Sequence, residues 1–305
     1  MSARNEIADY LDVDLLARLP NLEFRARFLV DGFFNGLHAS PFRGSNVEFR
    51  EHRKYHPGDD ISDIDWKAYA RTDRLHVRIH EDDTNLNAHL LLDRSASMNF
   101  RGPLASMNKW DYARSIAAAL LLFLNRQKDA STLTLVGKHA DFSGHPASTD
   151  LHFRRQLQRL AIEADSGECN WHTALTELEK EIHPRSIVIL ISDFYTDPAS
   201  FSQQFDQLRA KGCELLLFHI IDPAETDFPG SDPLLLEDNE TGERLTLTPE
   251  LIRDSFQEEV RVHAEALSEL VRSRGGDYLQ LKTDRVPLDL FGAYLNLRAK
   301  RGKRR

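Results

Sequence analysis

Two continuous apolar runs, each ending in a carboxylate, constrain the fold of this chain most. The first run ends at Asp93 (His89–Asp93, HLLLD) and the second at Asp193 (Ile187–Asp193, IVILISD). Such runs are typical of strands buried on both faces, as in parallel sheets covered by helices. Ligands of these sheets bind just beyond the carboxyl ends of the strands, so we expect Asp93 and Asp193 to face one site.

Asp93 begins an Asp-x-Ser-x-Ser pattern that includes Ser95 and Ser97. One carboxylate and two hydroxyls on a turn, faced by a second carboxylate, form an all-oxygen site that suits Mg²⁺ or Mn²⁺. Residues two apart on a strand lie about 6.6 Å apart, but adjacent Mg²⁺ ligands lie about 3 Å apart, so residues 93–97 must curl around the ion. The alternative is a capping turn, because Asp and Ser are favoured N-caps and a helix is predicted from Trp110.

From Ala88 onward, strand patterns alternate with helix patterns. This alternation predicts an α/β fold, namely an open, mostly parallel sheet with helices on both faces. The predicted strands end at Asp93 or cover 131–137, 186–192, 213–221 and 278–281. The predicted helices cover 107–127, 151–163, 171–182, 199–211, 249–273 and 287–298. A β-hairpin is predicted near 232–248, with its turn at Asn239–Gly242.

The N-terminal part has a different pattern. Residues 5–36 are amphipathic and predicted helical, with a break at Pro20, and residues 45–84 are rich in charge and turns, with short strands such as Leu75–Ile79. We therefore divide the chain into three parts. These are an N-terminal helical and charged β segment (1–84), an α/β domain with a hairpin insertion (85–299), and a basic tail (300–305) that we expect to be disordered.

Composition narrows the functional classes. The formal net charge of −9 argues against nucleic acid as the main partner. Two cysteines do not make a disulfide framework, which fits a reducing compartment. The sequence has neither an 18-residue apolar run nor a signal peptide's apolar stretch. We therefore predict a cytoplasmic protein without stable membrane insertion.

The Asp93-x-Ser95-x-Ser97 element and the strand ending in Asp193 resemble a von Willebrand factor A-like domain with a metal-ion-dependent adhesion site. The segment Glu48–Asp60, continued by Ile64–Lys67 and Ala70–Arg71, resembles the hallmark of the domain-of-unknown-function-58 family. These resemblances imply a non-enzymatic interaction module, in which an acidic residue of a protein partner completes the metal shell. They also imply a partnership with a MoxR-type AAA+ ATPase in the maturation or remodelling of a complex.

One position departs from the adhesion-site pattern. Such sites usually take a Thr from a loop before a helix, and Cys169 stands there in this sequence. A thiol is a poor ligand for Mg²⁺. Thr173 is the alternative ligand if the loop is shifted, and extra waters could also replace the missing hydroxyl. A metal-free interaction scaffold is therefore the alternative to a metal-dependent module.

The sequence gives less support to an enzymatic function. A haloacid-dehalogenase-like phosphatase would need a second Asp where Ser95 stands, and no nucleophile elbow, phosphate loop or dinucleotide fingerprint is present. We interpret the acidic cluster at Asp59, Asp60, Asp63 and Asp65 as an ion-pair and turn network rather than a second metal site or an active site. We predict that the protein is not an enzyme. The alternative is a hydrolase that holds a metal-activated water at Asp93 or Asp193.

Overall fold

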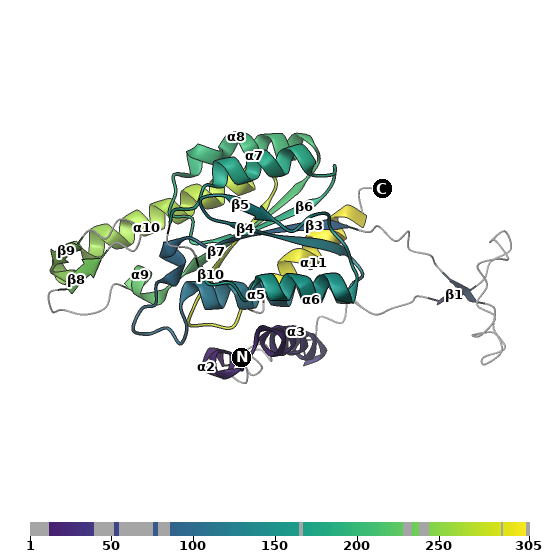
Figure 1. The fold of residues 1–305 in the computed structure, drawn as a ribbon, viewed down its shortest axis with the longest axis horizontal. Coiled ribbons are helices and arrows are strands. Elements are labelled where there is room, and N and C mark those ends of the chain that lie inside the picture. The colour runs from purple at the N-terminus through teal and green to yellow at the C-terminus, as the bar shows by residue number, and fades with distance from the viewer. Residues whose placement is uncertain are drawn as a thin grey trace.

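The computed structural model of the protein describes residues 12–39, 52–54, 76–78, 86–164, 167–227, 234–237, 244–287 and 289–302. Among these residues, the largest sheet has six strands in the order β10-β7-β6-β3-β4-β5 (Figure 1). In chain order they are β3 (Asn87–Asp93), β4 (Ala130–Val136), β5 (Ala140–Phe142), β6 (Ile187–Ser192), β7 (Glu214–Ile221) and β10 (Asp277–Lys282). Neighbouring strands are parallel except for β4 and β5, which are antiparallel.

Helices cover both faces of this sheet (Figure 1). One face carries α5 (Lys109–Arg126), α6 (Asp150–Arg159) and α11 (Asp289–Gly302). The other carries α7 (Trp171–Glu181), α8 (Ser202–Ala210) and α10 (Pro249–Arg272). The predicted fold class is confirmed: the sheet is open and mostly parallel, with one antiparallel edge strand, as expected for a von Willebrand factor A-like fold.

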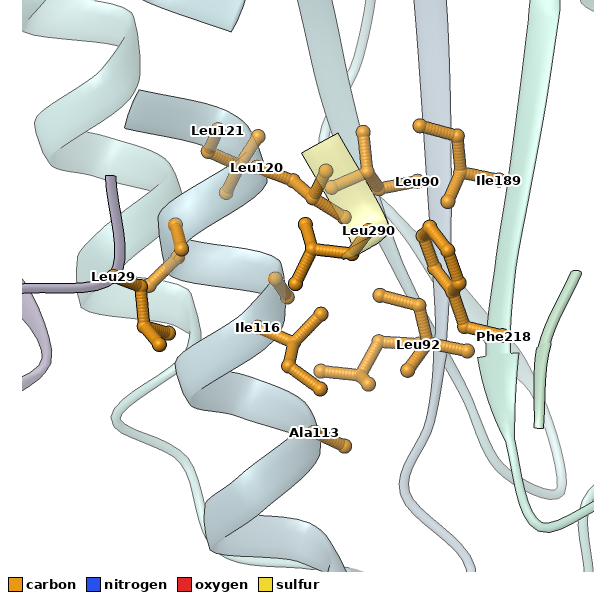
Figure 2. Packing of buried hydrophobic residues seen from close by; sticks show 14 of the residues in the cluster. Leu29, Leu90, Leu92, Ala113, Ile116, Leu120, Leu121, Ile189, Phe218 and Leu290 are labelled. Carbon is orange, nitrogen blue, oxygen red and sulfur yellow. The ribbon is translucent and has the colours of Figure 1, made fainter. Parts of the chain in front are cut away.

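The central strands contribute to two separate cores, one on each face of the sheet. On β3, Leu90 and Leu92 pack in the core beneath α5, whereas Leu91 belongs to the core beneath α7 and α8. Figure 2 shows Leu90 and Leu92 on the side of β3 that faces Leu120 and Ile116 of α5, with Ile189 of β6 in the same cluster. Successive side chains of a strand point to opposite faces, so a strand covered on both faces must be apolar at every position. This explains the continuous apolar runs.

The N-terminal helices α2 (Val13–Arg18) and α3 (Leu22–Ala39) add a layer outside α5 (Figure 1). The ring centroid of Phe33 on α3 lies 6.1 Å from the ring centroid of Phe123 on α5 and 5.0 Å from that of Phe291 on α11. Covered by the sheet on one side and by α3 on the other, α5 is buried along most of its length. The N-terminal helices thus share the core of the α/β domain, and the division at residue 84 stays a prediction.

The predicted hairpin is confirmed, because β8 (Leu234–Glu237) pairs antiparallel with β9 (Arg244–Leu247). The short strands β1 (His52–Lys54) and β2 (His76–Arg78) also pair antiparallel. Most of the hallmark segment and the acidic cluster at Asp59, Asp60, Asp63 and Asp65 lie outside the described residues.

Some predicted boundaries are wrong. The helix expected over 151–163 ends at Arg159, because the following N–H groups make short 3₁₀-type bonds to Gln158 and Arg159. The helix expected over 199–211 begins as a 3₁₀ turn, η3 (Pro198–Phe201). The last helix continues to Gly302, into the tail that we expected to be disordered. The short edge strand β5 was not predicted, because three residues show no clear periodicity.

Candidate metal centre

The loop after β3 curls as the Asp-x-Ser-x-Ser pattern predicts. The Asp93 Oδ1 atom accepts a 2.8 Å hydrogen bond from the backbone N–H of Ser95, and the turn continues into the 3₁₀ helix η2 (Ala96–Asn99). The hydroxyl oxygens of Ser95 and Ser97 consequently lie 3.0 Å apart. Adjacent oxygen ligands of Mg²⁺ have about the same separation. The local backbone therefore brings together three oxygen-bearing side chains, and the separation of the two hydroxyl oxygens suits a small hard cation.

Asp93 is also fixed to the neighbouring strand. The Ser192 hydroxyl, at the end of β6, donates a hydrogen bond to Asp93 Oδ2, and Asp193 follows Ser192 directly. Both carboxylates are buried, with 1% of Asp93 and 2% of Asp193 exposed. Burial, and then the charge of Asp193, raises the pKa of Asp93 to about 6 despite the hydrogen bonds from Ser192 and Ser95. A bound cation would favour the ionised form of this carboxylate.

The backbone after Asp193 is strained. Phe194 has a φ of 51°, in the left-handed region that a bulky residue rarely adopts. The ring of Phe194 is buried and stacks on that of Trp171, with the two ring centroids 5.3 Å apart. The backbone carbonyl oxygen of Phe194 lies 2.9 Å from Nε2 of His263. These contacts hold Phe194 in its unfavourable conformation. The sharp turn therefore fixes Asp193 at the strand end instead of letting the strand continue.

Sequence reasoning missed Lys109, the first residue of α5. Its side chain is fully buried, and its Nζ atom lies 2.6 Å from Asp193 Oδ2 and 2.7 Å from Glu225 Oε1. Glu225 lies in the short helix α9 (Pro223–Asp227), at the carboxyl end of β7. A signal was present in the sequence, because a lysine is unfavourable in the first turn of a helix, where the macrodipole is positive. Lysine at this position is therefore a reason to look for a nearby carboxylate.

The structure places Cys169 beside the site. Its sulfur lies 3.7 Å from the carbonyl oxygen of Val136, which is opposite Asp93 in the pairing of β3 with β4. Thr173 lies in the first turn of α7, where its backbone N–H donates to the capping side chain of Asn170. A backbone hydrogen bond from Ala96 to Gly167 joins this loop to the serine turn. A role of Cys169 or Thr173 as a ligand stays a prediction.

The residues present fit a cation on the side of the serine turn. Asp93, Ser95 and Ser97 offer hard oxygen atoms, and Asp193 offers a carboxylate that Lys109 already binds. Within the described part of the chain, no three His, Cys, Asp or Glu side chains gather in a way that could hold a metal. The candidate centre therefore depends on its serine hydroxyls, and Mg²⁺ or Mn²⁺ suits it better than a soft transition metal.

None of the helices in the described part of the chain has the length and apolar character needed to cross a membrane.

Two solved structures with a similar chain trace come from Bacteroides. The conserved hypothetical protein BatB from Bacteroides thetaiotaomicron is 11% identical, with a TM-score of 0.48 over 70% of this chain and 99% of that one. An aerotolerance-related membrane protein from Bacteroides fragilis is 10% identical, with a TM-score of 0.49 over 69% of this chain and 98% of that one.

Several proteins have a higher sequence identity to this chain than these two structures do. The uncharacterized protein Rv1480 from Mycobacterium tuberculosis is 31% identical over 283 residues, which cover 91% of this chain and 87% of that protein. The uncharacterized protein YeaD from Bacillus subtilis is 29% identical over 110 residues, covering 36% of this chain and 25% of YeaD. Residues 51–266 match the family described as "Protein of unknown function DUF58". Since this match spans most of the chain and includes the serine turn, Asp193 and Lys109, the chain belongs to the DUF58 family.

Proposed function

We propose that this protein is a non-enzymatic interaction module that binds Mg²⁺ or Mn²⁺ through Asp93, Ser95, Ser97 and Asp193. The observation that carries the proposal is the serine turn, in which two hydroxyl oxygens 3.0 Å apart lie beside a buried carboxylate. When bound, the ion would offer a coordination position to an acidic residue of a protein partner. Binding of metal and binding of partner would then strengthen each other by the same free energy.

The partner that the family resemblance implies is a MoxR-type AAA+ ATPase, and complex maturation or remodelling is the process it implies. The position of the candidate centre supports docking of a partner, because the centre lies in the loops at the carboxyl edge of the sheet, where ligands of such folds bind, and Ser97 is partly exposed there. An acidic side chain of the ATPase would complete the metal shell.

A pull-down tests this proposal. We expect the MoxR-type ATPase from the source organism to be retained by the wild-type protein in Mg²⁺, and to be lost in EDTA. We expect the same loss with Asp93→Asn, which keeps the shape of the side chain but removes its charge. Asp141→Asn is the control, because it removes an exposed carboxylate from the edge strand β5. Equal retention in EDTA and by Asp93→Asn would contradict metal-mediated docking.

A metal-free scaffold is the second candidate. Lys109 favours it, because the ammonium group 2.6 Å from Asp193 Oδ2 already neutralises the carboxylate that a metal would use. In that case the same loops would bind the partner through ordinary polar and apolar contacts. Retention of the ATPase in EDTA, together with the absence of Mg²⁺ binding, would support this candidate over the first.

A further inference from the structure

The ammonium group of Lys109 is enclosed on several sides. It lies within hydrogen-bond distance of Asp193 and Glu225, 4.6 Å from the ring centroid of Tyr195 and 5.6 Å from that of Phe100. The lysine side chain has no exposed surface. A buried ammonium needs compensating charge, and two carboxylates supply it here. The charge of Lys109 is therefore shared between a candidate metal ligand, Asp193, and a carboxylate from the helix α9, Glu225.

Glu225 is positioned independently of Lys109. Its second carboxylate oxygen, Oε2, accepts a 2.8 Å hydrogen bond from the backbone N–H of Asp222. Asp222 in turn accepts hydrogen bonds from the backbone N–H groups of Gly102 and Ala224. A Cβ atom at Gly102 would lie only 2.2 Å from Asp222 Oδ1, so the two loops are in close contact. Glu225 can therefore hold Lys109 without help from Asp193.

We infer that Lys109 is a positioning residue that competes with the metal for Asp193. This inference rests on the proposed function. A divalent ion and an ammonium group that share one carboxylate repel each other strongly in a buried site. Metal binding to Asp193 would therefore require Lys109 to give up its bond to Asp193 and to remain paired with Glu225. The balance between the two carboxylates would set the metal affinity.

Mn²⁺ binding, measured by electron paramagnetic resonance on the full-length protein, tests the inference. Lys109→Met removes the competing charge and keeps an unbranched side chain of similar length. We expect it to bind Mn²⁺ at least about tenfold more tightly than the wild type. Its metal-free form should melt at a lower temperature, since two buried carboxylates lose their partner. Unchanged or weaker Mn²⁺ binding by Lys109→Met would overturn the inference.

Glu225→Gln should have the opposite effect. Without the second carboxylate, Lys109 is paired with Asp193 alone, and we expect Mn²⁺ affinity to fall by about tenfold. Glu214→Gln is the matched control, because it makes the same substitution at a buried glutamate at the opposite end of β7. Equal losses in Glu225→Gln and Glu214→Gln would contradict competition and indicate a general effect of charge. This comparison decides the question if Lys109→Met does not fold.

Mn²⁺ binding by the wild type distinguishes a failure of this inference from a failure of the proposed function. Mn²⁺ binding by Lys109→Met but not by the wild type would support competition and contradict a metal-dependent function of the natural protein. Binding by the wild type with no change in Lys109→Met would leave the proposed function intact and overturn the inference. Absence of binding in every variant would overturn both.

Discussion

Replacing Phe123 with alanine should lower the free energy of unfolding by about 3–5 kcal/mol. Phe123 is fully buried on α5, and its ring centroid lies 5.0 Å from that of Phe291 and 6.0 Å from that of Tyr294, both on α11. It also stacks on Phe34 of α3 at 5.9 Å. Truncation would remove contacts to two helices, α3 and α11, at once and leave a cavity between them and α5. Urea denaturation followed by circular dichroism measures the loss.

Phe24→Ala is the matched control, because Phe24 lies on α3 with 53% of its surface exposed. We expect this variant to lose less than about 1 kcal/mol. If Phe123→Ala and Phe24→Ala unfolded at the same urea concentration, the packing of α3 and α11 around α5 would be contradicted. Because Phe123 joins the N-terminal helices to the sheet domain, the experiment also tests whether both belong to one cooperative core.

The second large effect concerns acid stability. His89 on β3 is 6% exposed, and burial, with His183 as the second cause, lowers its pKa from 6.5 to about 4. Between these two pH values the unfolded chain binds a proton that the folded protein does not. The stabilising contribution is therefore complete above pH 6.5 and is lost as the pH falls toward 4. From pH 7 to pH 5, His89 should account for a loss of about 2 kcal/mol.

His89→Met isolates this contribution. Nε2 of His89 is buried without a hydrogen-bond partner among the described residues, so an apolar side chain of similar size can replace the ring. We expect the free energy of unfolding of His89→Met to depend less on pH than that of the wild type, with a difference of about 2 kcal/mol between pH 7 and pH 5. Parallel pH profiles for the two proteins would show that His89 is not held neutral by burial.

Much of the fold could be predicted because the buried strands show their environment in their own sequence. The runs that end at Asp93 and Asp193 are apolar at nearly every position, which a strand covered on both faces requires. The serine turn could be predicted for a similar reason, since Asp93, Ser95 and Ser97 are neighbours along the chain. The meeting of Asp93 with the end of β6 followed from the rule for parallel strand ends.

The remaining features of the site depend on contacts between distant parts of the chain. Lys109 is 84 residues from Asp193 and 116 residues from Glu225, and no local pattern couples them. The role of Ser192 was not predicted, because this residue lies within an apolar strand. A lone polar residue in such a run nevertheless indicates a specific hydrogen-bond partner. The backbone strain at Phe194 could not be foreseen either, because it is imposed by the packing of its ring against Trp171.

Titration calorimetry with Mg²⁺, on metal-stripped wild type and on Asp93→Asn, tests the central claim most directly. Asp93 holds the serine turn by a hydrogen bond to the Ser95 N–H, and Asn can still accept that bond while it lacks the charge that binds a cation. We expect saturable Mg²⁺ binding to one site in the wild type and its loss in Asp93→Asn, with circular dichroism showing that both proteins are folded. No binding by the wild type at millimolar Mg²⁺, or equal binding by both proteins, would contradict a metal site at Asp93.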